Sequence, residues 1–160
     1  MEELHQFYSA ETYRPENSAG YLVNRLAQAV TREIDRRMAD LGLTDAQWKP
    51  LVLLRQGDCV TAADLSRMAC HDTGAVTRLL DRLEAKGLIR RVRSEADRRI
   101  INLELTDEGQ KVSAEVPKIL STLANQVLAG FSEVEFQVFR DLLGRALSNA
   151  QALSGERNPL

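Results

Sequence analysis

Residues Asp72–Thr106 read DTGAVTRLLDRLEAKGLIRRVRSEADRRIINLELT, and this stretch decides the fold. Apolar side chains recur at Val76, Leu79, Leu80 and Leu83, a spacing that places all four on one face of a helix. Gly87 follows the last turn and ends the helix, as glycine commonly does at this position. The opposite face is mostly small, hydroxylated or cationic, and carries Thr73, Gly74, Thr77, Arg78, Asp81 and Arg82.

Two alternating segments follow this helix and predict a β-hairpin. They are Leu88–Arg93 and Arg99–Leu105, and in the second we expect Ile101, Leu103 and Leu105 to face the protein body. Upstream, Thr61 to Asp64 begins a short helix that breaks near Cys70 and His71. A short helix, a tight turn and a longer helix form the helix-turn-helix pattern, and the hairpin is its wing. A polar helix face and a basic hairpin suit the major groove and the adjoining backbone or minor groove of a duplex.

Long amphipathic helices flank this unit. We expect one over Tyr21–Leu41, a second opened by Thr106-Asp107-Glu108, and a third opened by a capping box at Ser132–Glu135. The expected fold is mainly α (α+β): a winged helix-turn-helix lobe over 44–106, with N- and C-terminal helices over 18–41 and 107–153 forming a dimerisation region. Residues 1–17 form an N-terminal arm and 154–160 a loose tail. Packing of the flanking helices into one core within a single chain is the alternative.

Charge is concentrated in the same stretch. The 160-residue chain has a net charge of −2, but eight cationic and four acidic residues lie between Arg78 and Arg99, which leaves −6 for the remainder. A basic island on an acidic body is typical of localised duplex binding.

Other classes of function find little support in the sequence. No apolar run approaches the ~20 residues of a membrane span, and no secretory signal opens the chain, so we expect a cytoplasmic protein that binds no membrane. The two cysteines, Cys59 and Cys70, are isolated from other ligating residues, which argues against zinc. No catalytic triad, phosphate loop or metal cluster is present, so we expect neither an enzyme nor a cofactor.

The motif TRLLDRLEAKGLI, followed by Asp97-Arg98-Arg99 and by LELTDEG at 103–109, resembles the MarR family of bacterial transcriptional regulators. The resemblance covers about residues 18–153. It implies a cytoplasmic, nucleoid-associated homodimer whose two winged lobes grip palindromic double-stranded DNA, and repression that a small ligand relieves.

The resemblance also assigns roles to residues. It places recognition-helix contacts on Thr73, Gly74, Thr77 and Arg78, with Arg82 further along the same face. In the wing, Arg99 reaches the minor groove, Asp97 braces it, and Arg98 lies beside them. Structural alternatives remain open at this stage: an Arg78–Asp81 ion pair, and an Asp97–Arg99 salt bridge without a DNA role.

Many members of the family bind aromatic carboxylates or phenols between the dimer helices and the winged lobe, which implies such an effector here. A cation would hold the carboxylate and an aromatic ring would stack on the ligand. The alternatives are a core role for Trp48, a turn role for His71 and an ion pair for Arg25. The candidates are Arg14, Tyr21, Asn24, Arg25, Trp48, Lys49 and His71, and His5 could also reach in.

Two other functions compete with a ligand-responsive repressor. The first is a thiol-based redox regulator of the same fold that uses Cys59 or Cys70. Relatives that sense peroxides carry a cysteine near the start of the first helix, and this chain has none there. The second is a helical dimerisation or adaptor module whose basic hairpin binds protein.

Overall fold

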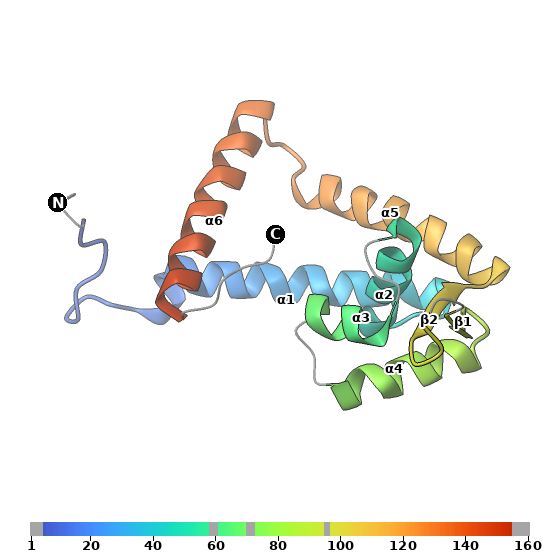
Figure 1. The fold of residues 1–160 in the computed structure, drawn as a ribbon. Coiled ribbons are helices and arrows are strands. Elements are labelled where there is room, and N and C mark those ends of the chain that lie inside the picture. The colour runs from blue at the N-terminus through green and yellow to red at the C-terminus, as the bar shows by residue number, and fades with distance from the viewer. Residues whose placement is uncertain (1–4, 58–60, 70–72, 95–96, 155–160) are drawn as a thin grey trace.

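The computed structural model describes residues 5–57, 61–69, 73–94 and 97–154, and helices dominate it (Figure 1). The mainly helical fold with a small two-stranded sheet is as expected. The elements are η1 (Pro15–Asn17), α1 (Ala19–Met38), η2 (Ala39–Leu41), α2 (Asp45–Gln56), α3 (Ala62–Ala69), α4 (Thr73–Ala85), β1 (Ile89–Arg93), β2 (Ile101–Leu105), α5 (Asp107–Val127) and α6 (Glu133–Ser154).

Side-chain caps begin four of the helices, and those of α5 and α6 lie where the sequence predicts them. The Ser18 hydroxyl accepts a hydrogen bond from the Tyr21 amide at 3.1 Å and so starts α1. A cap of this kind stabilises a helix by about 1 kcal/mol because it satisfies an amide that has no partner within the helix. The other capping groups are Thr44 with Gln47 at α2, Thr106 at α5, and Ser132 with Glu135 at α6.

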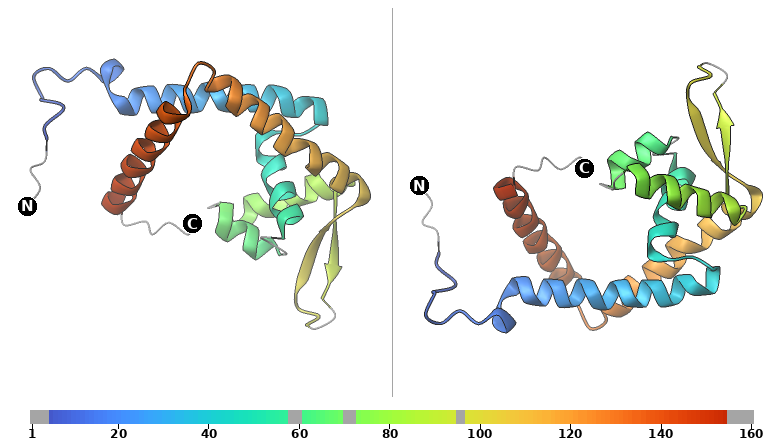
Figure 2. Two further views of the ribbon diagram at one scale, coloured as in Figure 1. Left: turned by 90° about the horizontal axis from the view of Figure 1, so that it is seen from above. Right: turned by 90° about the horizontal axis from the view of Figure 1, so that it is seen from below.

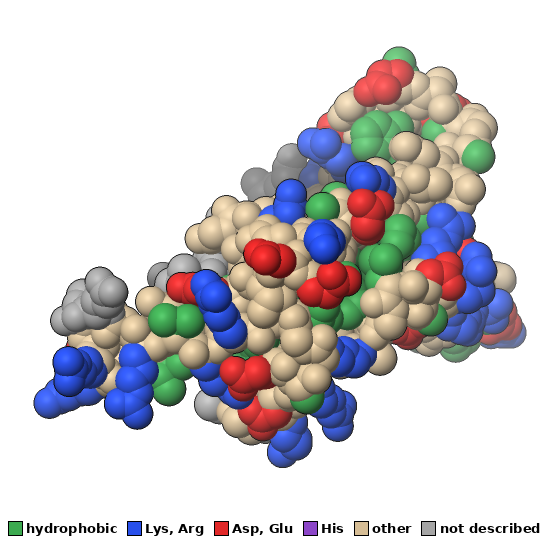
Figure 3. All heavy atoms as spheres, turned by 90° about the vertical axis from the view of Figure 1, so that its right-hand side faces the viewer, with side chains coloured by type: hydrophobic (Ala, Val, Ile, Leu, Met, Phe, Trp, Pro, Cys, Tyr) green, Lys and Arg blue, Asp and Glu red, His purple; other side chains and the backbone are tan. Residues whose placement is uncertain are grey.

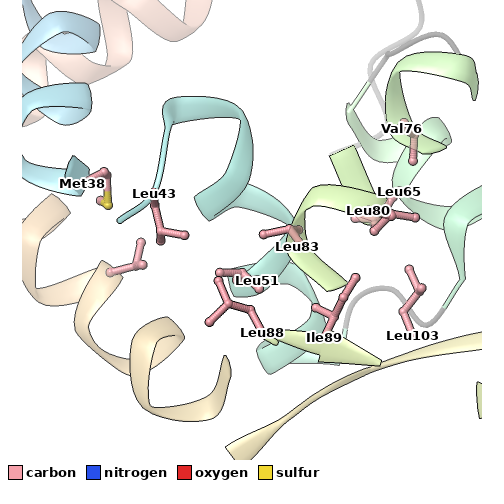
Figure 4. Packing of buried hydrophobic residues seen from close by; sticks show 11 residues of the cluster. Met38, Leu43, Leu51, Leu65, Val76, Leu80, Leu83, Leu88, Ile89 and Leu103 are labelled. Atoms are coloured by element: carbon pink, nitrogen blue, oxygen red, sulfur yellow. The ribbon is translucent and has the colours of Figure 1, made fainter. Parts of the chain in front are cut away.

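The core of the winged unit is closed by one chain. Figure 4 shows how side chains from α2, α3, α4 and the hairpin converge on this core. The apolar face of α4 faces inward as predicted: Val76, Leu80 and Leu83 are buried, and Leu79 is half-buried. The whole cluster comprises Met38, Leu43, Leu51, Leu65, Val76, Leu80, Leu83, Leu88, Ile89, Leu103 and Val116.

A tight joint connects the hairpin to α5. The Thr106 hydroxyl donates to the Gly87 carbonyl at 2.5 Å, and the Thr106 amide donates to the Leu88 carbonyl at 3.1 Å. Gly109 lies so close to this turn that a β-carbon there would meet the Leu88 carbonyl oxygen at 1.9 Å. These contacts explain why the LTDEG motif has a threonine and a glycine three residues apart. Both contact backbone carbonyls of the KGLI motif.

The two strands pair antiparallel, with Ile89 opposite Leu105 and Arg91 opposite Leu103. The predicted inward face of β2 is only partly correct. Leu103 is buried and Leu105 is half-buried, but Ile101 is 48% exposed. The hairpin projects away from the body (Figure 2), and the core residues named above end at Leu103 on this strand, so Ile101 lies beyond the core.

The terminal helices are arranged differently from the lobe. The C-terminal part of α1 packs against α2 and α5, and Met38 is fully buried there. The N-terminal part of α1 leaves Leu22, Val23 and Leu26 exposed. Figures 1 and 2 show α6 standing apart from the other helices, and none of its described side chains is buried.

Candidate nucleic-acid interface

The recognition helix α4 presents a polar face to solvent. Thr77, Arg78 and Arg82 are exposed on it, and Gly74 is half-buried. Thr73 begins the helix, and its side chain lies outside the described part of the chain. Asp81 forms an ion pair with Arg91 at 2.7 Å, and no Arg78–Asp81 pair occurs within the described residues. The guanidinium of Arg78 therefore stays available for a phosphate or for guanine O6 and N7.

The wing presents further cations on a shaped turn. The Asp97 carboxylate accepts a hydrogen bond from the Arg99 amide at 2.9 Å, so its contact with Arg99 is to the backbone. The Ile100 amide donates to the Asp97 carbonyl at 2.9 Å, and the Ser94 amide donates to the Ile100 carbonyl at 2.9 Å. Asp97 thus sets the conformation of the turn, and the side chains of Arg98 and Arg99 remain exposed. Figure 3 shows the wing as the projection at the left, with Lys and Arg side chains near its tip.

Three of the eight cations in the basic island are engaged within the protein. Lys86 donates to the Gly42 carbonyl at 2.5 Å and to the Gln47 side chain at 2.8 Å. Arg90 pairs with Glu104 on the neighbouring strand at 2.7 Å. Arg91 is held by Asp81 and Glu84 of α4.

The remaining five cations form no ion pair among residues 5–57, 61–69, 73–94 and 97–154. They are Arg78, Arg82, Arg93, Arg98 and Arg99, and all are exposed. Arg93 is absent from the DNA contacts expected from the sequence. It shares a face of β1 with Arg91 and lies two residues nearer the tip of the wing, so it extends the cationic edge. The alternation of residues along β1 places Arg93 on the same face as Arg91, but the sequence does not show which way that face points.

The expected effector residues lie in two separate groups within one chain. Tyr21, Asn24 and Arg25 are exposed near the start of α1, and the Arg25 guanidinium lies 5.9 Å from the Tyr21 ring centre. Seventeen residues of helix separate Tyr21 from Met38, or about 25 Å at the usual rise. Trp48 and Lys49 lie on α2, whose first residue, Asp45, donates its amide to Asp35 near that far end of α1 at 2.8 Å.

The other candidates have local partners. Trp48 is half-buried against the core and donates to the Asp45 carboxylate at 3.0 Å, which agrees with its structural alternative. Arg14 donates to the Tyr13 carbonyl at 3.1 Å, and the His5 ring lies 6.1 Å from that of Phe7. His71, Cys59 and Cys70 lie outside the described residues.

A cavity of about 200 Å³ separates α2 from the recognition helix. Its lining is mostly apolar and includes Val76 and Leu79 of α4, while Asp45 and Lys49 of α2 supply the charged groups. A neighbouring groove shares Val76 and Leu79 and continues to Arg78 and Arg82. Ligand pockets usually enclose about 300–1,000 Å³, so this cavity suits a molecule of about one ring. A ligand in this cavity would contact the buried side of α4, and the exposed side of the same helix carries the arginines.

The described part of the chain offers little for other chemistry. It contains no group of three or more His, Cys, Asp or Glu side chains that could hold a metal ion. None of its helices is long and apolar enough to cross a membrane.

Comparisons with known proteins converge on one family. The MarR family profile matches residues 43–101, which cover the winged unit up to the start of β2. The multiple antibiotic resistance protein MarR of Escherichia coli (strain K12) is 30% identical over 109 residues, which cover 68% of this chain and 76% of that protein.

Solved structures of two regulators bound to DNA show the same fold. A mutant MarR from E. coli complexed with operator DNA matches with a TM-score of 0.70 and 28% identity, over 80% of this chain and 92% of that one. The S. aureus MepR–DNA complex matches with a TM-score of 0.73 and 25% identity, over 85% of this chain and 99% of that one.

Proposed function

This chain belongs to the MarR family of transcriptional regulators, and on that premise we propose that it is a homodimeric repressor that a small aromatic acid releases from a palindromic operator. The observation that carries the proposal is the division of the cations in residues 78–99. Five exposed arginines of α4 and the wing form no ion pair within the described part of the chain, while the other three cations are bonded inside the lobe. Free cations at these two places suit the two grooves of one duplex.

The roles of the DNA-reading residues follow from their positions. Thr73, Gly74, Thr77, Arg78 and Arg82 lie along α4 and would contact base edges and phosphates in the major groove. Asp97, Arg98 and Arg99 form the wing turn, where Arg99 would enter the minor groove and gain from the negative potential of a narrow A·T tract. Asp97 would hold the turn that presents Arg99.

Dimerisation would use residues 18–41 and 107–153. The exposed apolar side chains of α6 and of the N-terminal half of α1 lack a cover within the described chain, and a second copy would supply one. The arm over 1–17 starts from the same end of α1. Its Tyr8 hydroxyl accepts a hydrogen bond from the Ala19 amide at 2.9 Å, and Phe7 is 84% exposed. Residues 154–160 would form a tail.

The effector would occupy the cavity between α2 and α4. Its carboxylate would bind the Lys49 ammonium, which now lies 3.9 Å from Asp45, and its ring would contact Val76 and Leu79. Filling this space would move α4 relative to α2 and change the spacing of the two reading heads, which are the winged lobes of the two chains.

The DNA-binding claim is tested on a duplex that the wild-type protein selects from a random-sequence pool. Arg78→Ala and Arg99→Ala should each weaken binding by about 1–3 kcal/mol, or about 5- to 150-fold, without lowering the melting temperature. Arg32→Ala is the matched control, since this exposed arginine lies on α1. Equal affinity of the wild type for a scrambled duplex would contradict sequence-specific binding, and failure to bind either duplex would favour an adaptor role.

The effector claim is tested by a thermal-shift screen of benzoate and its ring-substituted analogues. A ligand that binds only the folded state at 100 times its Kd stabilises the protein by about 2.7 kcal/mol. Lys49→Met should abolish the shift, while Lys118→Met on α5 should retain it. No shift from any such acid, or an equal shift in Lys49→Met, would refute this site.

A further inference from the structure

We propose that Arg91 is a positioning residue that clamps the wing to the recognition helix, so that the major-groove and minor-groove contacts are presented as one rigid unit. The proposal rests on the DNA-binding function above. It assigns Arg91, Asp81 and Glu84 a role in the protein rather than on the DNA.

Three hydrogen bonds make the clamp. One Nη atom of Arg91 donates to the Asp81 carboxylate at 2.7 Å, and the other makes a short contact with the Glu84 carboxylate. The Arg91 amide also donates to Glu84 at 3.2 Å. Arg91 lies on β1, whereas both acids lie on the C-terminal half of α4, so the bonds cross from the wing to the helix.

The environment of Arg91 differs from that of the free arginines. Its side chain is 28% exposed, and burial acts to lower its pKa, but the bonds to Asp81 and Glu84 outweigh this and raise the pKa above its usual value. Charge-assisted hydrogen bonds of this kind are about twice as strong as neutral ones. The guanidinium therefore remains charged and has a fixed orientation.

Direct binding of DNA by this cluster is unfavourable on charge alone. One arginine with two carboxylates has a net charge of −1, and a phosphate would be repelled by it. Asp81 and Glu84 on a DNA-reading helix cost affinity through the same repulsion. Their presence is explained if they hold the wing.

The wing needs such support because a two-stranded hairpin is marginally stable by itself. On its β2 side, Thr61 forms a β-bridge with Asn102. On its β1 side, the Arg91 clamp supports the hairpin. Arg91 pairs with Leu103, so the clamp lies one residue pair further from the tip than the bridge at Asn102. Beyond these two supports lie Arg93 and the turn with Arg98 and Arg99, so a change at the supports alters where these arginines point.

The test compares two adjacent arginines of equal charge. Arg91→Met cuts the link between wing and helix and keeps an unbranched stem, whereas Arg90→Met removes an ion pair that lies wholly within the hairpin. Each variant is titrated with the duplex selected by the wild type, and the grooves are probed by hydroxyl-radical cleavage for the wing and by guanine-N7 methylation for α4.

We expect Arg91→Met to weaken specific binding by at least about 10-fold and to lose the minor-groove protection while it retains the guanine protection. Arg90→Met should reduce the affinity for the selected duplex by less than about 5-fold, which is the effect of removing one charge near DNA. It should keep both the minor-groove and the guanine protection. The double variant Asp81→Ala/Glu84→Ala is the sharpest arm, because removing two negative charges should tighten binding by electrostatics alone. The clamp predicts weaker specific binding and tighter binding to a scrambled duplex.

Two results would overturn the clamp: an Arg91→Met variant that behaves like Arg90→Met, or a double variant that binds the selected duplex more tightly than the wild type. If Arg91→Met does not fold, the double variant decides. Failure of the wild type to select any duplex would count against the proposed function instead.

Discussion

The winged lobe and helix α6 use similar apolar residues with opposite results. In the lobe, leucines of α2, α3, α4 and the hairpin are buried against one another within a single chain. In α6, Val134, Val138, Leu142, Leu147 and Leu153 are between 51% and 90% exposed. The lobe, together with Met38 of α1 and Val116 of α5, therefore completes one core within a single chain, whereas α6 carries an apolar surface that its own chain leaves exposed.

The difference indicates which part of the chain needs a partner. Burying a leucine or valine side chain contributes about 1.5–3 kcal/mol, so the exposed side chains of α6 represent a large unrealised stabilisation. Helix α1 contains the boundary: Met38 belongs to the core, while Leu22 at its other end is 63% exposed. A second copy that covers this end and α6 would join two self-sufficient reading heads.

The largest expected effect is on the free energy of unfolding, when a leucine is replaced by alanine in the lobe and in α6. Leu83→Ala should lower the free energy of unfolding by about 4 kcal/mol, because Leu83 is fully buried and its removal leaves a cavity. Leu153→Ala, at a position 90% exposed in the single chain, should change the free energy of unfolding of the monomer, measured at protein concentrations too low for dimerisation, by less than about 0.5 kcal/mol. Urea unfolding measures both. Comparable losses would show that the lobe is not a separate core.

The next effect should appear in assembly rather than in folding. Leu142→Glu places a charge on the exposed apolar face of α6 and should weaken dimerisation by about 3 kcal/mol, or more than 100-fold in Kd, while the helical circular-dichroism spectrum of the lobe persists. Ser148→Glu, which adds the same charge elsewhere on α6, is the control. Sedimentation equilibrium measures the change, and equal weakening by both variants would show that charge, not the apolar face, is responsible.

The smallest effect concerns acid stability where α1 meets α5. Hydrogen bonds from Arg36 and Arg37 lower the pKa of Glu33 to about 2, and Arg37 also donates to Gln126 of α5 at 2.6 Å. Because the pKa of Glu33 is lowered in the folded state, its ionised carboxylate stabilises the fold at pH values above the ordinary pKa of 4.5. This stabilisation is lost as the pH falls towards 2. Between these values the melting temperature of the wild type should therefore fall more steeply than that of Glu33→Gln. Parallel curves in thermal melts would show that this pair contributes nothing.

The sequence predicts local features well. The capping box at Ser132–Glu135 and the buried face of α4 depend on residues within one or two turns of one another, and the structure confirms them. The helix expected over Tyr21–Leu41 instead comprises α1 over Ala19–Met38 and the 3-10 turn η2 over Ala39–Leu41. The exposure of Ile101 was mispredicted because alternation along a strand does not reveal how far the core extends beneath it.

Long-range pairings could not be predicted from local spacing. Arg91 and Asp81 are ten residues apart, and Lys86 and Gly42 are 44 apart, so only the fold brings them together. The eight cations of the basic island look alike in the sequence, yet three are bonded within the lobe. The expected effector set was likewise divided between the two ends of α1, because a straight helix separates Tyr21 from Trp48.

The proposed dimer joins two winged lobes, each with a core closed within one chain, through a helical region that a second copy completes. The most direct measurement is the mass of the complex with the selected duplex, determined by analytical ultracentrifugation across a protein titration. Two chains per duplex, bound together with no singly occupied intermediate, and two wing footprints about one helical turn apart, ~34 Å, are predicted. A single chain that binds the duplex with full affinity and leaves one footprint would contradict the account.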